Sequence, residues 1–296
     1  MQDKLANIVC IKSKIFGGKL NRNIKLLTEK EIKKELIEIL KKFDRFASEN
    51  ELKYSISSGT MLGAVRHAGF IPWDDDIDVI MLRSDYDKLV QILLKNNYID
   101  ENIQAIGYEL HNSDIPFIKI VNKSIIAKEV QRETITIETY LWVDIFPLDA
   151  VPTRGEKLYT FYIEKILRKI YQYRREAEYK FIIKRNSIKN YIMSIIKKIL
   201  AKISFDDFIS LYIRQCSKYS IENCEKIKDI TWGNKSFPKE LMNEIVEYEF
   251  ENIVVKGMKD YDTYLTGLYG NYMKLPKEEE RINHGIKAWR VGNDEE

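Results

Sequence analysis

The first part of the chain shows the apolar spacing of an amphipathic helix. Positions 32, 36, 40, 43 and 47 are apolar, and this repeat of three to four residues predicts a helix. Thr28 and Glu31 have the spacing of a capping box, in which each side chain accepts a backbone hydrogen bond at the helix start. We therefore expect a helix that begins at Thr28 and runs through Ala47.

Short strands and helices are expected to alternate after this helix. The predicted elements are a strand at 52–56, a turn at 57–60, a helix at 61–66, a strand at 77–82 and a helix at 84–96 capped by Ser84 or Asp85. From 103 to 146, β-branched and aromatic residues become dense, which predicts several strands with a turn at Asn122-Lys123. This order is typical of an α+β fold.

Composition divides the chain into four segments. A polar leader at 1–27 precedes a core at 28–152, a basic helical region at 153–225 and a C-terminal region of mixed structure at 226–296. Residues 154–202 hold 14 Lys or Arg and 4 Asp or Glu, a local charge of +10. A solvated helical face and a contact with an anionic membrane surface both account for this charge. Nucleic acid is the weakest interpretation, because no recognition motif accompanies the charge.

Composition also excludes several classes of protein. The chain has 48 basic and 45 acidic residues, and this balance argues against a dedicated nucleic-acid binder. Its longest stretch without a charged residue, at 54–65, has 12 residues, fewer than the roughly 20 that a membrane-spanning helix needs. Three cysteines without a C-x-x-C pair fit a reducing compartment. We expect a cytoplasmic protein, peripheral on the inner face of the membrane if the basic region binds there.

The residues that suggest chemistry begin at Ser58-Gly59-Thr60, between a predicted strand and a predicted helix. Backbone N–H groups and hydroxyls at a helix start suit a phosphate. Asp76 and Asp78 follow, two residues apart, so that both carboxylates lie on one face of the next strand. Two carboxylates this close repel, and a divalent cation relieves the repulsion.

Asp144 supplies a third carboxylate. It lies in the apolar segment 141–146, where Trp142 and Phe146 are expected on the same strand face as Asp144. Three carboxylates beside a phosphate-binding turn are typical of metal-assisted phosphoryl or nucleotidyl transfer. The sequence therefore predicts Mg²⁺ or Mn²⁺ held by Asp76, Asp78 and Asp144.

These segments resemble the LicD family, the phosphocholine transferases that also include fukutin-like proteins. The resemblance covers 57–79 and 143–149, and it recurs weakly at 264–276 with His284 beyond. It implies a polymerase-β-type nucleotidyltransferase core, a mixed sheet with flanking helices, joined to the basic helical region. The resemblance also implies that Asp76, Asp78 and Asp144 are catalytic.

The family resemblance further implies a donor and an acceptor. The donor would be CDP-choline or another CDP-alcohol, and the acceptor a glycan or lipid-linked glycan such as a teichoic acid or lipopolysaccharide precursor. Ser58, Gly59 and Thr60 would hold the donor phosphates. Aromatic faces such as Trp73 could bind a quaternary ammonium, although most aromatic residues must belong to the core.

Two further residues have both a structural and a functional interpretation. His67 follows Arg66 near the expected helix end, where it would either interact with the helix dipole or contact a donor phosphate. Lys119 lies in a strand-like segment, where it would either neutralise a phosphate or extend from an edge strand into solvent.

Two rival functions stay open at this point. A nucleotidyltransferase that moves NMP from an NTP to a small molecule or protein would use the same carboxylates. A non-catalytic scaffold of glycan assembly would have no reason to keep three clustered aspartates. The released product, CMP or pyrophosphate, separates the two enzymes.

Overall fold

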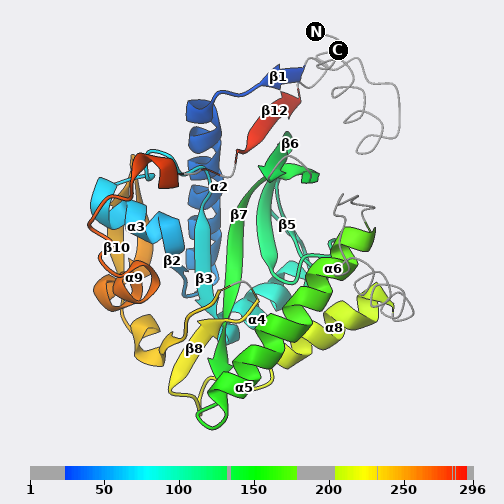
Figure 1. Ribbon diagram of the computed structural model, residues 1–296. Helices are drawn as coiled ribbons and strands as arrows, with labels where there is room; N and C mark the ends of the chain where they lie inside the picture. Colours follow the sequence, from blue (N-terminus) through cyan, green and yellow to red (C-terminus); the bar gives the residue numbers. More distant parts are fainter. Residues whose placement is uncertain are drawn as a thin grey trace.

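A mixed β-sheet runs through the middle of the molecule (Figure 1). The structure, a computed structural model, describes residues 24–131, 135–178, 204–231, 233–281, 283 and 285–291. In these residues, the sheet has ten strands. Its main path is β1 (Ile24–Leu26), β12 (Lys287–Val291), β6 (Ile118–Gln131), β7 (Ile135–Val151), β3 (Asp78–Leu82) and β2 (Ser55–Ile56). Beside β6 lie β5 (Ile103–Ile106) and β4 (Tyr98–Asp100), and beside β7 lie β8 (Lys226–Asp229) and β9 (Phe237–Pro238).

One pair of neighbours makes this sheet mixed. β3 and β7 run parallel, and the other pairs described in the sheet are antiparallel. Parallel neighbours need a long crossover connection, and the segment between β3 and β7 supplies it with a helix and three strands. The predicted α+β class, a mixed sheet with flanking helices, is therefore confirmed.

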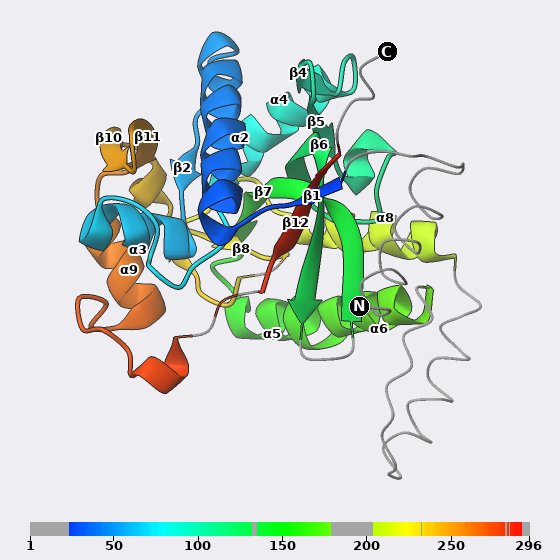
Figure 2. The same cartoon turned by 90° about the horizontal axis from the view of Figure 1, so that it is seen from above.

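Helices cover both faces of the sheet (Figure 2). α2 (Glu29–Glu49) and α4 (Arg83–Leu93) lie on one face. On the other, α5 (Glu156–Phe161), the π-helical turn η2 (Tyr162–Leu167) and α6 (Arg168–Glu178) form one continuous rod. α8 (Phe205–Cys216) packs against this rod through a separate cluster of buried residues.

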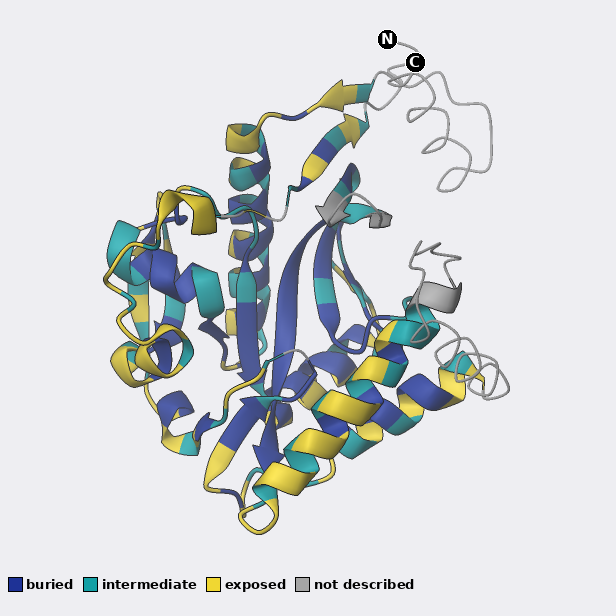
Figure 3. Ribbon diagram, viewed as in Figure 1, coloured by how far each residue is buried: buried dark blue, intermediate teal, exposed yellow. Residues whose placement is uncertain are grey.

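The first helix begins as predicted. Thr28 Oγ1 accepts the N–H of Glu31, and the Glu31 carboxylate accepts the N–H of Thr28, which completes the capping box. All five apolar positions of the predicted repeat are buried against the sheet. Figure 3 shows the sheet and the inner side of this helix as the main core.

A smaller unit stands beside the β2 and β3 edge of the sheet (Figure 1). It contains α3 (Ser58–His67), α9 (Tyr261–Tyr269) and a hairpin of β10 (Ile245–Phe250) with β11 (Ile253–Met258). The N–H of Met258 donates to the buried hydroxyl of Ser55 over 2.9 Å, so the end of β11 is joined to β2. Segments about 200 residues apart in the sequence therefore meet around α3.

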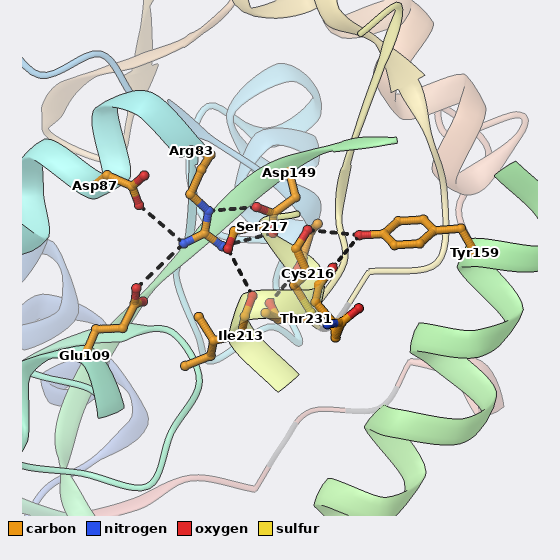
Figure 4. A network of polar contacts seen from close by, with 11 residues as sticks. Arg83, Asp87, Glu109, Asp149, Tyr159, Ile213, Cys216, Ser217 and Thr231 are labelled. Carbon is orange, nitrogen blue, oxygen red and sulfur yellow. Dashed lines mark hydrogen bonds and ion pairs between the residues drawn. The ribbon is translucent and has the colours of Figure 1, made fainter. Parts of the chain in front are cut away.

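A buried ion-pair network ties α4 to β7 (Figure 4). Arg83, the first residue of α4, donates to both carboxylate oxygens of Asp149 over 2.7 and 2.9 Å. Asp149 is fully buried and Arg83 is 7% exposed. The same guanidinium lies 3.6 Å from the carboxylate of Asp87 and 3.9 Å from that of Glu109. The network fixes the end of β7, five residues beyond Asp144.

Two predicted element starts are corrected. Ser58 to Thr60 form the first turn of α3, so this helix begins three residues earlier than expected. α4 begins at Arg83, and neither Ser84 nor Asp85 caps it, because Leu82 occupies the cap position without a side-chain hydrogen bond. Asp85 instead accepts the N–H of Lys53 over 3.4 Å.

The expected turn at Asn122-Lys123 is also wrong. Both residues lie within β6, where the register to β7 shifts between Asn122 and Ile126. The polar pair marks this irregularity, and the hairpin partners continue to Gln131 and Ile135. Of the predicted leader, residues 1–23 lie outside the described residues, and Ile24–Leu26 form β1.

Candidate functional site

A cavity of about 670 Å³ opens where β3 begins, beside the start of α3. Its walls come from segments that are distant in the sequence. The described lining consists of Ser58, Gly59, Leu62, Arg66, Ile71, Trp73, Asp74, Asp76, Asp78, Ile115, Phe117, Lys119, Trp142, Asp144, Phe146, Tyr171, Arg175, Asp229, Gly233, Tyr269, Asn271, Tyr272, Lys274, Pro276 and Ile286. The cavity therefore brings together seven of the nine predicted site residues, and Thr60 and His67 are not in its lining.

Thr60 lies behind the cavity and holds Asp78 in place. Its hydroxyl accepts the backbone N–H of Asp78 over 2.9 Å, and its side chain is buried. The N–H of Ser57 donates in turn to the Asp78 carbonyl, also over 2.9 Å. Both backbone groups of Asp78 are thus fixed by the turn that starts α3. The described contact of Thr60 is with the protein backbone, which makes it a positioning residue for Asp78.

The first turn of α3 approaches the acidic loop closely. A Cβ on Gly59 would lie only 2.4 Å from Asp74 Oδ2, so a side chain at this position would displace the Asp74 carboxylate. Ser58 has a left-handed φ of 48°, a conformation that costs energy for a residue other than glycine. The N–H of Ser58 donates to the hydroxyl of Tyr264 over 3.2 Å, and burial raises the pKa of that hydroxyl to about 12, so it stays protonated.

The strand register places two of the predicted carboxylates side by side. Asp78 is the Cα partner of Asp144 on the parallel strand, so the two residues are direct neighbours across β3 and β7. Asp76 was expected on the same strand face as Asp78, but β3 begins only at Asp78, so Asp76 lies in the loop before it and lines the same cavity from there. The predicted strand face is as expected, because Trp142, Asp144 and Phe146 all line the cavity. The alternate residues Leu141, Val143 and Ile145 are fully buried in the main core.

Lys119 is the immediate partner of Asp144. The two residues are opposite each other on β6 and β7, and Lys119 Nζ lies 2.7 Å from Asp144 Oδ1. The indole N–H of Trp142 donates to Asp144 Oδ2 over 3.0 Å. The same ammonium lies 4.2 Å from the centre of the Trp142 ring and 5.5 Å from that of Phe117. This wall of the cavity therefore already binds one cation, between aromatic faces and a carboxylate.

Two other cationic side chains contact residues of the cavity wall, and one of them, Arg66, is itself part of the lining. The Arg281 guanidinium lies over the ring of Trp73, 4.9 Å from its centre. Arg66 donates through Nη1 to the carbonyl of Tyr272 and through Nε to His67 Nε2 over 3.0 Å. Partial burial, and then the neighbouring Arg66, lower the pKa of His67, so its ring is neutral at pH 7. In the described geometry His67 therefore orients Arg66, which itself lines the cavity.

The contribution of α6 to the cavity was not predicted from the sequence. Tyr171 and Arg175, one helical turn apart, line the cavity from the basic region. The Tyr171 hydroxyl donates to the carbonyl of Asp114 over 3.2 Å, and Arg175 Nε lies 3.2 Å from the Asp114 carboxylate. Their alternation with lysines looked like an ordinary amphipathic helix. Only the packing of α6 across the sheet reveals their place.

Carboxylates of this kind are suitable ligands for a divalent ion, although the described side chains do not form a complete coordination site. In the described part of the chain, no group of three His, Cys, Asp or Glu side chains lies where it could hold a metal ion. Oxygen ligands are what Mg²⁺ and Mn²⁺ prefer, and the adjacent strand positions of Asp78 and Asp144 offer two of them. The ammonium of Lys119 shows that a positive charge is accommodated at Asp144.

Comparison with known proteins defines the class of this site. Residues 51–152 match the family model described as the LicD/FKTN/FKRP nucleotidyltransferase domain. This match includes the start of α3, the acidic loop, β3 and the cavity-lining part of β7. Residues 51–152 are thus similar to the nucleotidyltransferase domain of this family.

Individual relatives narrow the class further. The chain is 28% identical over 270 residues to the lipopolysaccharide cholinephosphotransferase LicD of Haemophilus influenzae, a match that covers 89% of this chain and 98% of that protein. Two uncharacterized proteins match shorter parts. One from Rickettsia prowazekii is 47% identical over 58 residues, 20% of this chain and 22% of its own length. One from Rickettsia typhi is 36% identical over 80 residues, 27% of this chain and 24% of its own length. The predicted resemblance to the LicD family is confirmed by the domain match and by the similarity to the Haemophilus influenzae protein.

Proposed function

We propose that this protein is a metal-dependent phosphocholine transferase, which moves phosphocholine from CDP-choline to a hydroxyl of a lipopolysaccharide-type glycan. The observation that carries the proposal is the pairing of Asp78 with Asp144 inside the cavity that α3 borders. The similarity to the Haemophilus influenzae cholinephosphotransferase over nearly its full length supports the transferred group and the acceptor class. The LicD-type domain at 51–152 supports a polymerase-β-type core.

Asp76, Asp78 and Asp144 would hold Mg²⁺ or Mn²⁺. When bound, the metal would neutralise the diphosphate of the donor and stabilise the departing phosphate. Thr60 and Ser57 hold Asp78 in position for the metal, because they bind the backbone N–H and the carbonyl of Asp78. Trp142 orients Asp144 by donating its indole N–H.

The reaction breaks one P–O bond and forms another. An acceptor hydroxyl oxygen attacks the phosphorus that bears choline, and the bond from this phosphorus to the bridging oxygen of the donor breaks. CMP leaves with the bridging oxygen, and the hydroxyl proton passes to a cavity carboxylate. Arg66 and Lys274 line the same cavity as these carboxylates and supply positive charge for the CMP phosphate.

The cationic choline head would bind at the aromatic wall near Asp144. A quaternary ammonium cannot donate a hydrogen bond, so it needs aromatic faces and a nearby carboxylate. Lys119 shows that this wall attracts a cation, because its ammonium lies over Trp142 and against Asp144, and choline would bind beside this ammonium, on Phe146. Phe117 and Phe146 extend the wall, with ring centres 4.5 Å apart.

A donor competition assay tests the choline part of this proposal. CDP-choline, CDP-ethanolamine, CDP-glycerol and CDP-ribitol would be offered together with Mg²⁺ and a glycan acceptor. We expect CDP-choline to react about tenfold faster than CDP-ethanolamine, because the ethanolamine ammonium is more strongly hydrated. A preference for a polyol donor would refute choline recognition and leave the metal mechanism standing. Release of pyrophosphate from an NTP, with no CMP from any CDP-alcohol, would favour nucleotidyl transfer instead.

A further inference from the structure

The rod formed by α5, η2 and α6 has two opposite faces of different character. Its inner face packs on α8 through Ile163, Leu167 and Tyr171, which are buried. Its outer face exposes four large apolar side chains within nine residues, Leu158, Phe161, Tyr162 and Ile166. Leu158 is 75% exposed and Phe161 is 55% exposed. Figure 3 shows the exposed residues along this rod, on the side away from the sheet.

Lysines alternate with these apolar residues on the same outer face. Lys157, Lys165 and Lys169 are all exposed there. The two acidic residues of this stretch are turned toward the protein, where Glu156 pairs with Lys226 and Glu164 pairs with Lys228. The outer face between 157 and 169 therefore combines apolar and basic side chains, while the two glutamates of this stretch form ion pairs with lysines of β8.

We propose that this outer face docks on an anionic membrane surface. Apolar side chains that enter the headgroup region, with basic residues between them, are the features of a helix that lies in the membrane interface. Anionic lipid attracts such lysines over about a Debye length. None of the helices in the described residues has the length and apolar character that spanning a bilayer requires.

The position of the rod gives this docking a consequence for the site. Tyr171 and Arg175, near the C-terminal end of the same rod, line the catalytic cavity. A membrane bound at the outer face therefore lies one helix away from the cavity wall. The inference goes beyond the proposed transfer reaction, since vesicle binding is measured without donor or acceptor.

Vesicle flotation of the full chain tests the proposal. We expect binding to vesicles of phosphatidylcholine with phosphatidylglycerol, weak binding to phosphatidylcholine alone, and a steep loss of binding as salt is raised. Lys157→Gln, Lys165→Gln and Lys169→Gln together should lower the partition coefficient by about 100-fold, since each lysine contributes roughly fivefold. Leu158→Ser with Phe161→Ser should lower it by about tenfold or more.

A matched control uses an exposed apolar and basic pair elsewhere. Leu94→Ser with Lys95→Gln changes exposed residues at the end of α4 and should leave vesicle binding unchanged. An unchanged melting temperature would show that each variant is folded. Equal binding to both kinds of vesicle, or outer-face variants that bind like the wild type, would overturn the proposal. A dimer in sedimentation velocity that Leu158→Ser with Phe161→Ser dissociates, without vesicle binding, would overturn it in favour of a second copy of the chain.

Discussion

Replacement of Thr60 by valine separates a positioning role from a phosphate-binding role. Valine keeps the shape of threonine and removes the hydroxyl that accepts the N–H of Asp78. Thr60 is only 3% exposed, so water cannot easily take the place of that hydroxyl. An unsatisfied buried donor costs about 2 kcal/mol of unfolding free energy, which in a chain of 296 residues corresponds to a fall of about 3 °C in the melting temperature.

The same substitution should also reduce catalysis. Because Asp78 loses one of its two backbone anchors, we expect kcat for CMP release to fall at least about tenfold, with a smaller change in KM for CDP-choline. Thr60→Ser is the matched control, since serine keeps the hydroxyl and should retain most of the activity. Urea denaturation and steady-state kinetics measure both effects. A Thr60→Val protein as stable as the wild type, with a raised KM alone, would refute the positioning role and restore the phosphate interpretation.

Four further variants test other parts of the structure. Arg83→Met should lower the unfolding free energy by about 3–5 kcal/mol, because it leaves Asp149 buried without its partner. Asp149→Leu in the same chain should recover part of that loss in urea denaturation, and no recovery would contradict a buried pair. Burial raises the pKa of Glu109, so the folded state keeps this proton to a higher pH than the unfolded chain does, and stability falls as pH rises from about 4 through the raised pKa. Glu109→Gln should remove this pH dependence from melting temperatures measured across pH. An unchanged dependence would show that it does not come from Glu109. Lys119→Met should strengthen Mn²⁺ binding about tenfold in calorimetry, because the ammonium no longer competes for Asp144. An affinity equal to that of the wild type would argue against a metal at this carboxylate.

The sequence predicted the acidic part of the site better than its surroundings. Asp76 and Asp78 were expected to act together because strand residues two apart share a face, and the apolar setting of Asp144 marked a third carboxylate. The structure adds that Asp78 and Asp144 are neighbours on parallel strands. Such pairing depends on the crossover at 83–134 between β3 and β7, and spacing along one strand carries no information about it.

Other features required tertiary structure for a similar reason. The partnership of Lys119 with Asp144 follows from the register of β6 against β7, in a hairpin whose bulge at Asn122 resembled a turn in the sequence. Gly59 was recognised as part of a helix start, but its contact with Asp74 arises only when the acidic loop folds back. Local patterns therefore identified the elements and their polar faces, and packing determined which residues of distant elements meet.

The most direct test of the proposed function is ³¹P NMR of the purified protein with CDP-choline, Mg²⁺ and a lipopolysaccharide acceptor. The Asp78→Asn variant is measured under the same conditions. The account predicts that the diphosphate signals of CDP-choline disappear as CMP and a phosphodiester signal on the glycan appear together. Asp78→Asn should slow this conversion by about 100-fold or more while the protein stays folded. Stable CDP-choline signals in the presence of active wild-type protein and a competent acceptor, or turnover by Asp78→Asn at the wild-type rate, would contradict it.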